Sequence, residues 1–157
     1  GLSSSGWTVH RDAPGSSSVA HILLASRVAD GTLPQVTLTG MSADSVVAIG
    51  VSRGIIPDAT RLRSSTMLNG TGFTLSSSLP RTSGVAGDIE VVITALSDEA
   101  TAFSRSGDWV SVATDVAIGV DVSYKLATTD ESDVTMSWEA ESPRSYRSVV
   151  AIFRGAS

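Results

Sequence analysis

The sequence predicts an all-β protein, an antiparallel and jelly-roll-like β-sandwich of about ten strands with a partial internal repeat. First, apolar segments rich in Val and Ile are separated by Gly, Pro, Asp and Ser, a composition that favours strands over helices. Second, residues 89–94 and 120–125 alternate apolar and polar side chains, so that residues two apart share a face. Third, the order of segments in the first third of the chain returns in the last third.

The first copy of the repeat, residues 1–56, contains four predicted strands. They are the segment that begins with Gly6-Trp7, and residues 19–24, 36–39 and 45–49. Turn residues such as Pro14-Gly15 separate these segments, because they supply a fixed φ or tolerate a positive one. The uninterrupted apolar run at residues 22–24 predicts a central strand buried on both faces.

The second copy, residues 57–157, repeats this order. Its matching segments are Gly107-Asp108-Trp109-Val110, and then residues 120–126, 134–137 and 148–152. Trp109 lies 102 residues after Trp7, and the third segment lies 98 residues after its counterpart. The run at 149–152 also predicts a central strand.

Within the second copy, a strand pair at residues 73–79 and 88–96 precedes the matching segments and has no counterpart in the first copy. We expect a single β-sandwich domain over residues 1–157, in which strands of the first copy insert beside those of the second, because folds normally protect exposed sheet edges. In the alternative arrangement the first copy leaves a sheet edge open, and a neighbouring subunit covers it.

Two segments have no clear strand pattern. Residues 56–72 are predicted to form a long crossover between sheets, which Greek-key and jelly-roll topologies require. Residues 96–103 have a faint helical composition and are predicted to form a loop or a single helical turn.

Composition and charge exclude several classes of protein. A chain of 157 residues can bury a core without metal or disulfide crosslinks. The absence of cysteine removes disulfides, thiol nucleophiles and thiolate metal sites. The formal net charge of −5 argues against nucleic-acid binding, which requires a basic face. No apolar run approaches the roughly 20 residues that span a bilayer, so we expect no membrane partner.

No motif for catalysis stands out. The sequence has no Gly-x-Ser-x-Gly nucleophile elbow and no phosphate-binding loop, and His10 and His21 lack the spacing of a metal site. A hydrolase would need a carboxylate pair in a cleft, and nothing singles out two residues. Its candidates are Asp130, Glu131, Asp133, Glu139 and Glu141. We therefore expect no enzyme, no cofactor and no catalytic residue.

The acidic run at residues 130–133 offers oxygen ligands for calcium. Its spacing differs from that of an EF-hand loop, and a solvated hairpin tip explains it better. We therefore predict no metal site.

Four residues are candidate contacts for a partner protein or a glycan. Arg144, Tyr146 and Arg147 precede the last predicted strand and offer bidentate hydrogen bonds and stacking. Trp138 lies on an alternating strand and would form a sugar-stacking platform if it faced outward. A charged edge that prevents stray strand pairing explains the arginines equally well.

From residue 79 onward, the chain resembles a β-sandwich module that recurs in tail, fibre and other virion proteins of bacteriophages and prophages. The motifs that carry the resemblance are Leu79-Pro80, Gly87-Asp88-Ile89, Gly107-Asp108-Trp109, Tyr124-Lys125-Leu126-Ala127 and Ala151-Ile152-Phe153-Arg154-Gly155. Asp108 is an insertion relative to the module, and the first copy has Leu24-Ala25-Ser26-Arg27 instead of the aromatic-Lys-x-Ala signature. The motifs mark turns and core positions, so they bear on the fold more than on an activity.

This resemblance implies a non-enzymatic virion structural protein, either a capsid decoration (cement) protein or a small tail or fibre component. Such a protein is made in the host cytoplasm, is located in the virion, binds other capsid or tail proteins and forms a homo-oligomer. The alternative is a carbohydrate-binding module that attaches a particle to a glycan of the bacterial surface. Neither function requires a cofactor, nucleic acid or a membrane.

Overall fold

A computed structural model describes residues 7–15, 20–28, 55, 61–78, 85–105, 107–128 and 133–156. Within these ranges the chain forms ten strands and no helix, so the prediction of an all-β, antiparallel fold of about ten strands is confirmed. The strands are β1 (Thr8–Ala13), β2 (Ile22–Ser26), β3 (Leu62–Gly72), β4 (Thr74–Ser78), β5 (Ile89–Leu96), β6 (Ala102–Arg105), β7 (Val110–Asp115), β8 (Val120–Leu126), β9 (Asp133–Glu139) and β10 (Arg144–Phe153).

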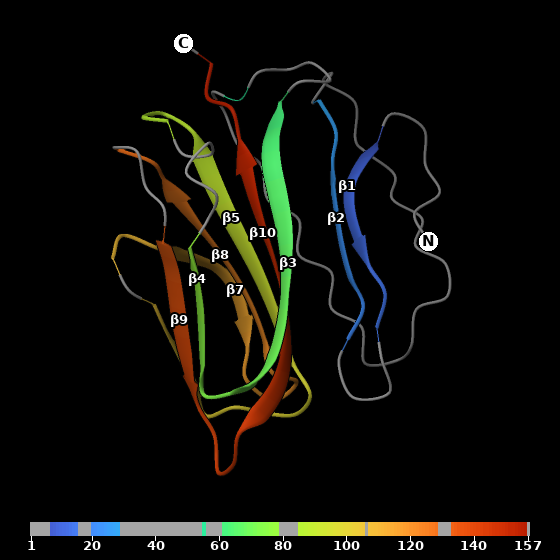
Figure 1. The fold of residues 1–157 in the computed structure, drawn as a ribbon, viewed down its shortest axis with the longest axis vertical. Coiled ribbons are helices and arrows are strands. Elements are labelled where there is room, and N and C mark those ends of the chain that lie inside the picture. Colours follow the sequence, from blue (N-terminus) through green and yellow to red (C-terminus); the bar gives the residue numbers. More distant parts are fainter. Residues whose placement is uncertain are drawn as a thin grey trace.

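The strands form three antiparallel sheets. The largest has the order β3-β10-β5-β8-β7, the second has the order β4-β9-β6, and β1 pairs only with β2. In Figure 1 the five-stranded sheet lies between the β4-β9-β6 sheet on the left and the β1–β2 hairpin on the right. The arrangement is consistent with a β-sandwich that carries an added hairpin, whereas the jelly-roll connectivity is not established and stays a prediction.

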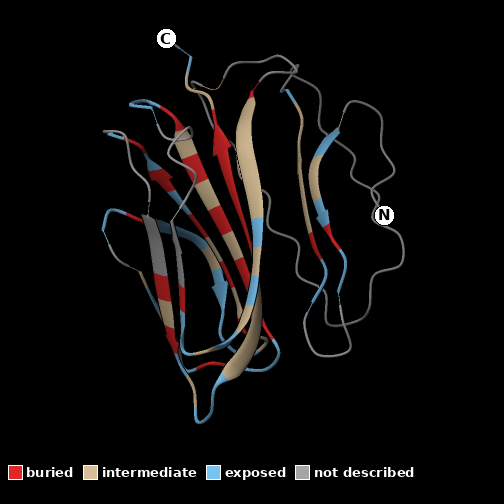
Figure 2. Cartoon of the chain, viewed as in Figure 1, coloured by how far each residue is buried: buried red, intermediate tan, exposed pale blue. Residues whose placement is uncertain are grey.

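The main core fills the space between the two larger sheets. Leu75, Met136 and Trp138 come from the three-stranded sheet and pack with Val92, Leu96, Val150 and Ile152 of the five-stranded sheet. Burial of such side chains provides the main driving force for folding, about 25 cal/mol per Å² of apolar surface. Strand β10 is buried continuously from Ser148 to Phe153, so the predicted central strand at 149–152 is confirmed (Figure 2).

A second, smaller core lies on the opposite face of the five-stranded sheet. Ala13 and Ile22 of the hairpin pack with Ala95 of β5 and Val149 of β10, and Leu24, Ile93 and Val120 are packed against this cluster. The five-stranded sheet is therefore covered on both faces along part of its width, which explains why β10 is apolar at consecutive positions.

Three sequence-based expectations about individual segments are wrong. Residues 62–72 do not cross irregularly between sheets but form β3, which pairs with β10 from Leu62↔Phe153 to Gly72↔Arg144. Part of the predicted loop at residues 96–103 belongs to β6. Residues 22–24 lie in a two-stranded hairpin and are only partly buried after Ile22, so they are not a central strand.

The β1–β2 and β7–β8 hairpins, which the repeat aligns, have the same register. Thr8 pairs with Ser26 and Val9 with Ala25, just as Val110 pairs with Tyr124 and Ser111 with Ser123. Each hairpin has one extra residue at the same place, His10 in β1 and Val112 in β7. Among the described residues, strands of the two copies pair with each other at no point other than the isolated bridge Ile55↔Gly155. Residues 36–39 and 45–49 lie outside the described ranges.

Candidate functional site

The aromatic pair among the predicted contact residues belongs to the core. Trp138 is only 3% exposed, and its Nε1 donates a hydrogen bond to the Gly72 carbonyl oxygen at 3.1 Å. The edge of its ring meets the ring of Tyr146 with 5.3 Å between centroids. Tyr146 is half-buried and packs against the main core. The two rings lie together, but Trp138 faces inward.

The two predicted arginines bind atoms of this chain and point to different neighbours. Arg144 donates to the Glu99 carbonyl oxygen at 3.1 Å and has its Nη1 3.7 Å from an Asp98 carboxylate oxygen. Arg147 donates to the Asn69 side-chain oxygen at 3.1 Å and to the Pro14 carbonyl oxygen. Arg144 thus holds the connection after β5, whereas Arg147 ties β10 to β3 and to the segment after β1.

The remaining residues that the sequence singled out have structural surroundings of their own. Trp109 is buried in the main core, and Trp7 is half-buried. His21 bonds to Asp12, and His10 bonds to Ser26 at 2.6 Å. Residues 130–132 lie outside the described ranges, and within those ranges no group of His, Cys, Asp or Glu could hold a metal ion. No helix in the described part of the chain is long and apolar enough to cross a membrane.

Strand β8 faces the main core with its polar side. Asp121, Ser123 and Lys125 are buried, whereas Tyr124 and Leu126 are exposed on the other face. The sequence predicts that polar and apolar residues alternate in β8, but not that the polar residues are the ones that face the core. Polar groups can face the core here because a network of hydrogen bonds satisfies them, and buried polar groups are stable only under that condition.

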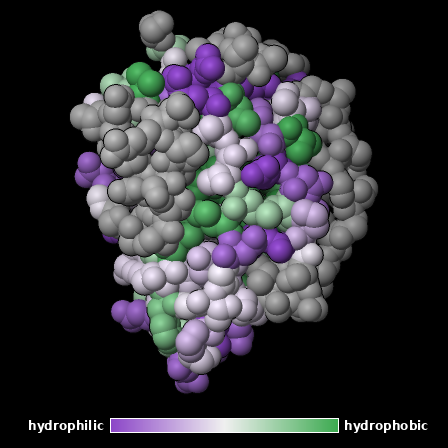
Figure 3. Space-filling view, in the orientation of Figure 1, coloured by the Kyte–Doolittle hydropathy of each residue, from purple (hydrophilic) through white to green (hydrophobic). Residues whose placement is uncertain are grey.

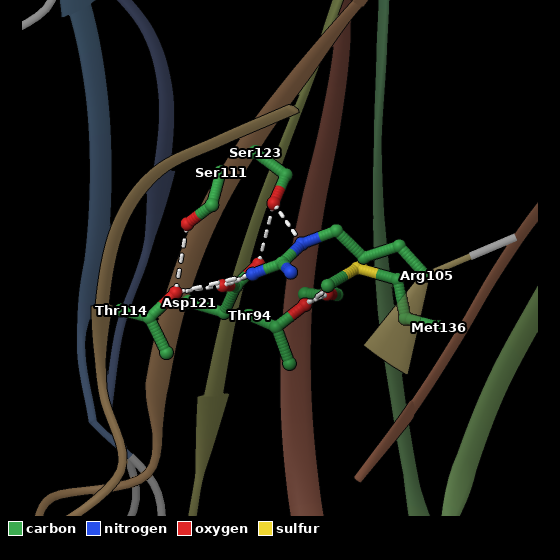
Figure 4. A network of polar contacts seen from close by, with 8 residues as sticks. Thr94, Arg105, Ser111, Thr114, Asp121, Ser123 and Met136 are labelled. Carbon is green, nitrogen blue, oxygen red and sulfur yellow. Dashed lines mark hydrogen bonds and ion pairs between the residues drawn. The ribbon is translucent and has the colours of Figure 1, made fainter. Parts of the chain in front are cut away.

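Arg105 of β6 organises this network (Figure 4). Its guanidinium reaches across to the five-stranded sheet, where it pairs with the fully buried carboxylate of Asp121 and donates to the Ser123 hydroxyl at 2.5 Å. Thr114 and Ser123 donate to the same carboxylate at 2.6 and 2.7 Å. The charges and hydroxyls are satisfied within the network, as in a structural clamp between two sheets.

Glu90 presents the opposite situation on the same face of the sheet. Its carboxylate is fully buried and both oxygens lack a hydrogen-bond partner, with the Lys125 Nζ 3.9 Å from one of them. Burial raises the pKa of Glu90, the positive charge of Lys125 opposes this, and the negative charge of Asp88 adds to it. Lys125 also lies over the Trp109 ring, 5.4 Å from its centroid.

A group of exposed apolar side chains lies where the five-stranded sheet ends. We call Val110, Val112, Tyr124 and Leu126 the β7–β8 apolar edge; each is between 40% and 55% exposed. Val110 and Tyr124 are directly paired, so they share a face of the sheet. Strand β7 is the last strand of its sheet, and within the described ranges nothing pairs with its outer side. Exposed apolar groups beside an unpaired edge are typical of a binding surface. The sequence does not reveal this site, because the alternation of polar and apolar residues in β8 does not show which face is outward.

Comparisons with protein-family models, with curated proteins and with solved structures found no match for this chain.

Proposed function

We propose that this chain is a non-enzymatic assembly protein that binds through the β7–β8 apolar edge, and more specifically a structural component of a bacteriophage virion. The observation that carries the proposal is the exposure of Val110, Tyr124 and Leu126 beside an open sheet edge. A capsid decoration protein or a small tail or fibre component acts by burying such surface against its neighbours. The virion assignment also depends on the sequence motifs described above.

We propose a second copy of this chain as the occupant of the edge. Within the chain, the β1–β2 hairpin already packs on the sheet that contains β8, and Val120 packs against the cluster that holds its repeat counterpart Ile22. A unit of this repeat therefore fits the outer face of the five-stranded sheet. The apolar edge continues this face beyond the part that the hairpin covers, so the corresponding surface of a neighbouring copy can extend it.

The carbohydrate-binding alternative has less support. A sugar-stacking platform needs an exposed aromatic face, and Trp138 is directed into the core. Arg144 and Arg147 are engaged by atoms of this chain. Tyr124 is the one tyrosine of the apolar edge, and it has no arginine among its strand partners.

Light scattering of the purified protein at micromolar concentration tests the proposal. We expect a defined oligomer for the wild type, and dissociation when Leu126→Lys places a charge in the apolar edge. Val85→Lys is the matched control, because Val85 is similarly exposed, at 47%, but lies outside this edge. A wild-type protein that is monomeric, or a Leu126→Lys variant that assembles like the control, would contradict the assembly role.

The virion assignment needs a separate measurement. Mass spectrometry of particles purified from the source phage should detect the chain in stoichiometric amounts. If the protein oligomerises but is absent from the particles, the assembly role stands and the virion assignment fails.

A further inference from the structure

Three arginines of the described ranges have neither a carboxylate within ion-pair distance nor a hydrogen-bond partner for Nε. Arg147 also has no carboxylate beside it, but its Nε donates to Asn69. Arg63, Arg105 and Arg144 each lie within ion-pair distance of a carboxylate, whereas no carboxylate lies within that distance of Arg11, Arg61 and Arg154. The chain carries a net charge of −5, so acidic groups are abundant in the molecule. Their absence beside these three cations is therefore a local feature of the fold.

The three arginines lie in or beside strands that meet at one end of the five-stranded sheet: Arg11 is in β1, Arg61 precedes β3 and Arg154 follows β10. The Arg154 amide donates to the Arg61 carbonyl oxygen at 2.8 Å, and Arg61 Nη2 donates to the Thr8 hydroxyl at 2.8 Å. Phe153, which precedes Arg154, meets the ring of His10 with 5.2 Å between centroids, and Arg11 follows His10 in β1. Strongly hydrophilic residues gather at this upper end of the molecule, where β3 begins and β10 ends (Figure 3).

The Nε atoms of the three arginines are withdrawn from water without a replacement partner. Arg61 is only 8% exposed, and among the described residues the one hydrogen bond of its side chain goes to Thr8. The Nε atoms of Arg11, Arg61 and Arg154 are all buried and have no hydrogen-bond partner. A guanidinium that loses its hydration needs an anion or acceptor in exchange, because an uncompensated buried charge is strongly unfavourable.

The neighbouring histidine responds to the same positive charge. The pKa of His10 is lowered, first by burial and then by the charge of Arg61. The second cause places the charge of Arg61 close to His10, at the same junction.

We propose that Arg11, Arg61 and Arg154 form a binding site for an oxyanion at the junction of β1, β3 and β10. Guanidinium groups present paired N–H donors that match the oxygens of a phosphate group or a carboxylate. The exposed Thr8 hydroxyl, which accepts from Arg61, retains its own proton to donate to the anion. The site is separate from the β7–β8 apolar edge and does not depend on the proposed assembly role.

Thermal unfolding in sodium phosphate, sodium acetate and sodium chloride at equal ionic strength and neutral pH tests this proposal. An anion that binds the folded state raises the unfolding temperature, and we expect a rise of about 3 °C or more over chloride. A rise in phosphate alone identifies a phosphate group as the ligand class, and a rise in acetate alone identifies a carboxylate. Equal unfolding temperatures in all three salts would overturn the proposal.

Variants locate the effect. Arg154→Gln should abolish most of the rise, as should Arg61→Gln, and the half-buried Arg154 provides a readable variant if Arg61→Gln fails to fold. Arg144→Gln removes the same charge where it pairs with Asp98 and should retain the full rise. If Arg154→Gln and Arg61→Gln retained the rise of the wild type, the anion would bind elsewhere and the assignment would be wrong.

Discussion

The guanidinium of Arg105 pairs with the carboxylate of Asp121 and thereby joins β6 of the three-stranded sheet to β8 of the five-stranded sheet. Asp121 is fully buried, whereas the Arg105 side chain retains 16% of its exposure. Two hydroxyl groups, those of Thr114 and Ser123, support the pair through three hydrogen bonds, so both oxygens of the Asp121 carboxylate have a partner.

Removal of one partner of this pair should be far more harmful than removal of both. Arg105→Met leaves the Asp121 charge buried, and we expect a loss of about 3–5 kcal/mol in the free energy of unfolding. In the double variant Arg105→Met with Asp121→Asn, much of this loss should be recovered, because no uncompensated charge remains. Urea unfolding of the single and double variants measures the difference. An Arg105→Met variant as stable as the wild type would show that the pair does not hold the sheets together.

Glu90 should make the protein less stable as the pH rises. Its pKa is raised in the folded state above its ordinary value of 4.5, so the folded state holds the proton more tightly than the unfolded state. The contribution of Glu90 is therefore fully present below that ordinary value and is lost as the pH rises through the folded pKa. We expect Glu90→Gln to be more stable than the wild type at neutral pH, and the two to converge near pH 4.

The exposed Glu139 supplies the control for this measurement. Glu139→Gln changes the same chemical group at the surface and should leave the pH dependence of stability unchanged. Unfolding by urea at a series of pH values compares the three proteins. A Glu90→Gln variant that is less stable than the wild type at neutral pH would mean that the Lys125 charge outweighs burial.

Asp88 should have the opposite pH dependence. Burial raises its pKa, but hydrogen bonds from Arg63 and from the Val85 and Gly155 amides prevail and hold the pKa below its ordinary value of 3.8. Its contribution is present above that ordinary value and is lost as the pH falls through the folded pKa. Asp88→Asn should therefore lower stability at neutral pH, with a deficit that shrinks in acid, whereas Asp108→Asn at an exposed site should not. A deficit that is constant with pH would refute this account.

Gly70 makes room for the ring of Tyr146, so a methyl group at this position should destabilise the protein. A Cβ at Gly70 would lie 2.6 Å from the Tyr146 hydroxyl oxygen and 2.8 Å from two ring carbons. The ring cannot easily move away because its other contact is Trp138 in the core. We expect Gly70→Ala to cost about 1–3 kcal/mol in the free energy of unfolding.

Gly72 lies two residues further along β3 and is the matched control. A Cβ there would have no neighbour closer than 3.9 Å, so Gly72→Ala should be much milder than Gly70→Ala in the same denaturation experiment. Similar losses for the two variants would show that the Tyr146 ring adapts freely.

The sequence predicts the strands well where their own side chains decide the structure, as in β10, whose apolar run is buried as expected. It does not predict β3, because Ser64, Ser65 and Asn69 have no apolar pattern and the strand exists through its pairing with β10. The sequence also does not show which face of β8 is buried. Asp121 faces the core only because the fold brings Arg105 to it from another strand and because the hairpin covers part of the opposite face.

The sequence predicts the candidate site less well than the fold, because the exposure of each side chain depends on contacts with distant strands. Trp138 and Tyr146 have the residue types of a binding platform, but they meet each other against the core. Tyr124 and Leu126 belong to one of the segments on which the sequence resemblance rests, yet their exposure depends on the position of β8 near the end of the sheet. Residue type alone does not reveal which side chains the remaining layers leave uncovered.

The common register of the two hairpins has a consequence for folding. Strand β1 pairs with β2 in the same register in which β7 pairs with β8. Strand β1 could therefore also pair with β8 in that register. What keeps each strand with its own partner is the short connection, from Ala13 to Ile22 and from Asp115 to Val120, since closing a short loop costs less entropy than closing a long one. At high protein concentration during refolding, pairing of strands from two chains competes with this local closure. We expect the product to be a domain-swapped dimer whose strands keep the native register.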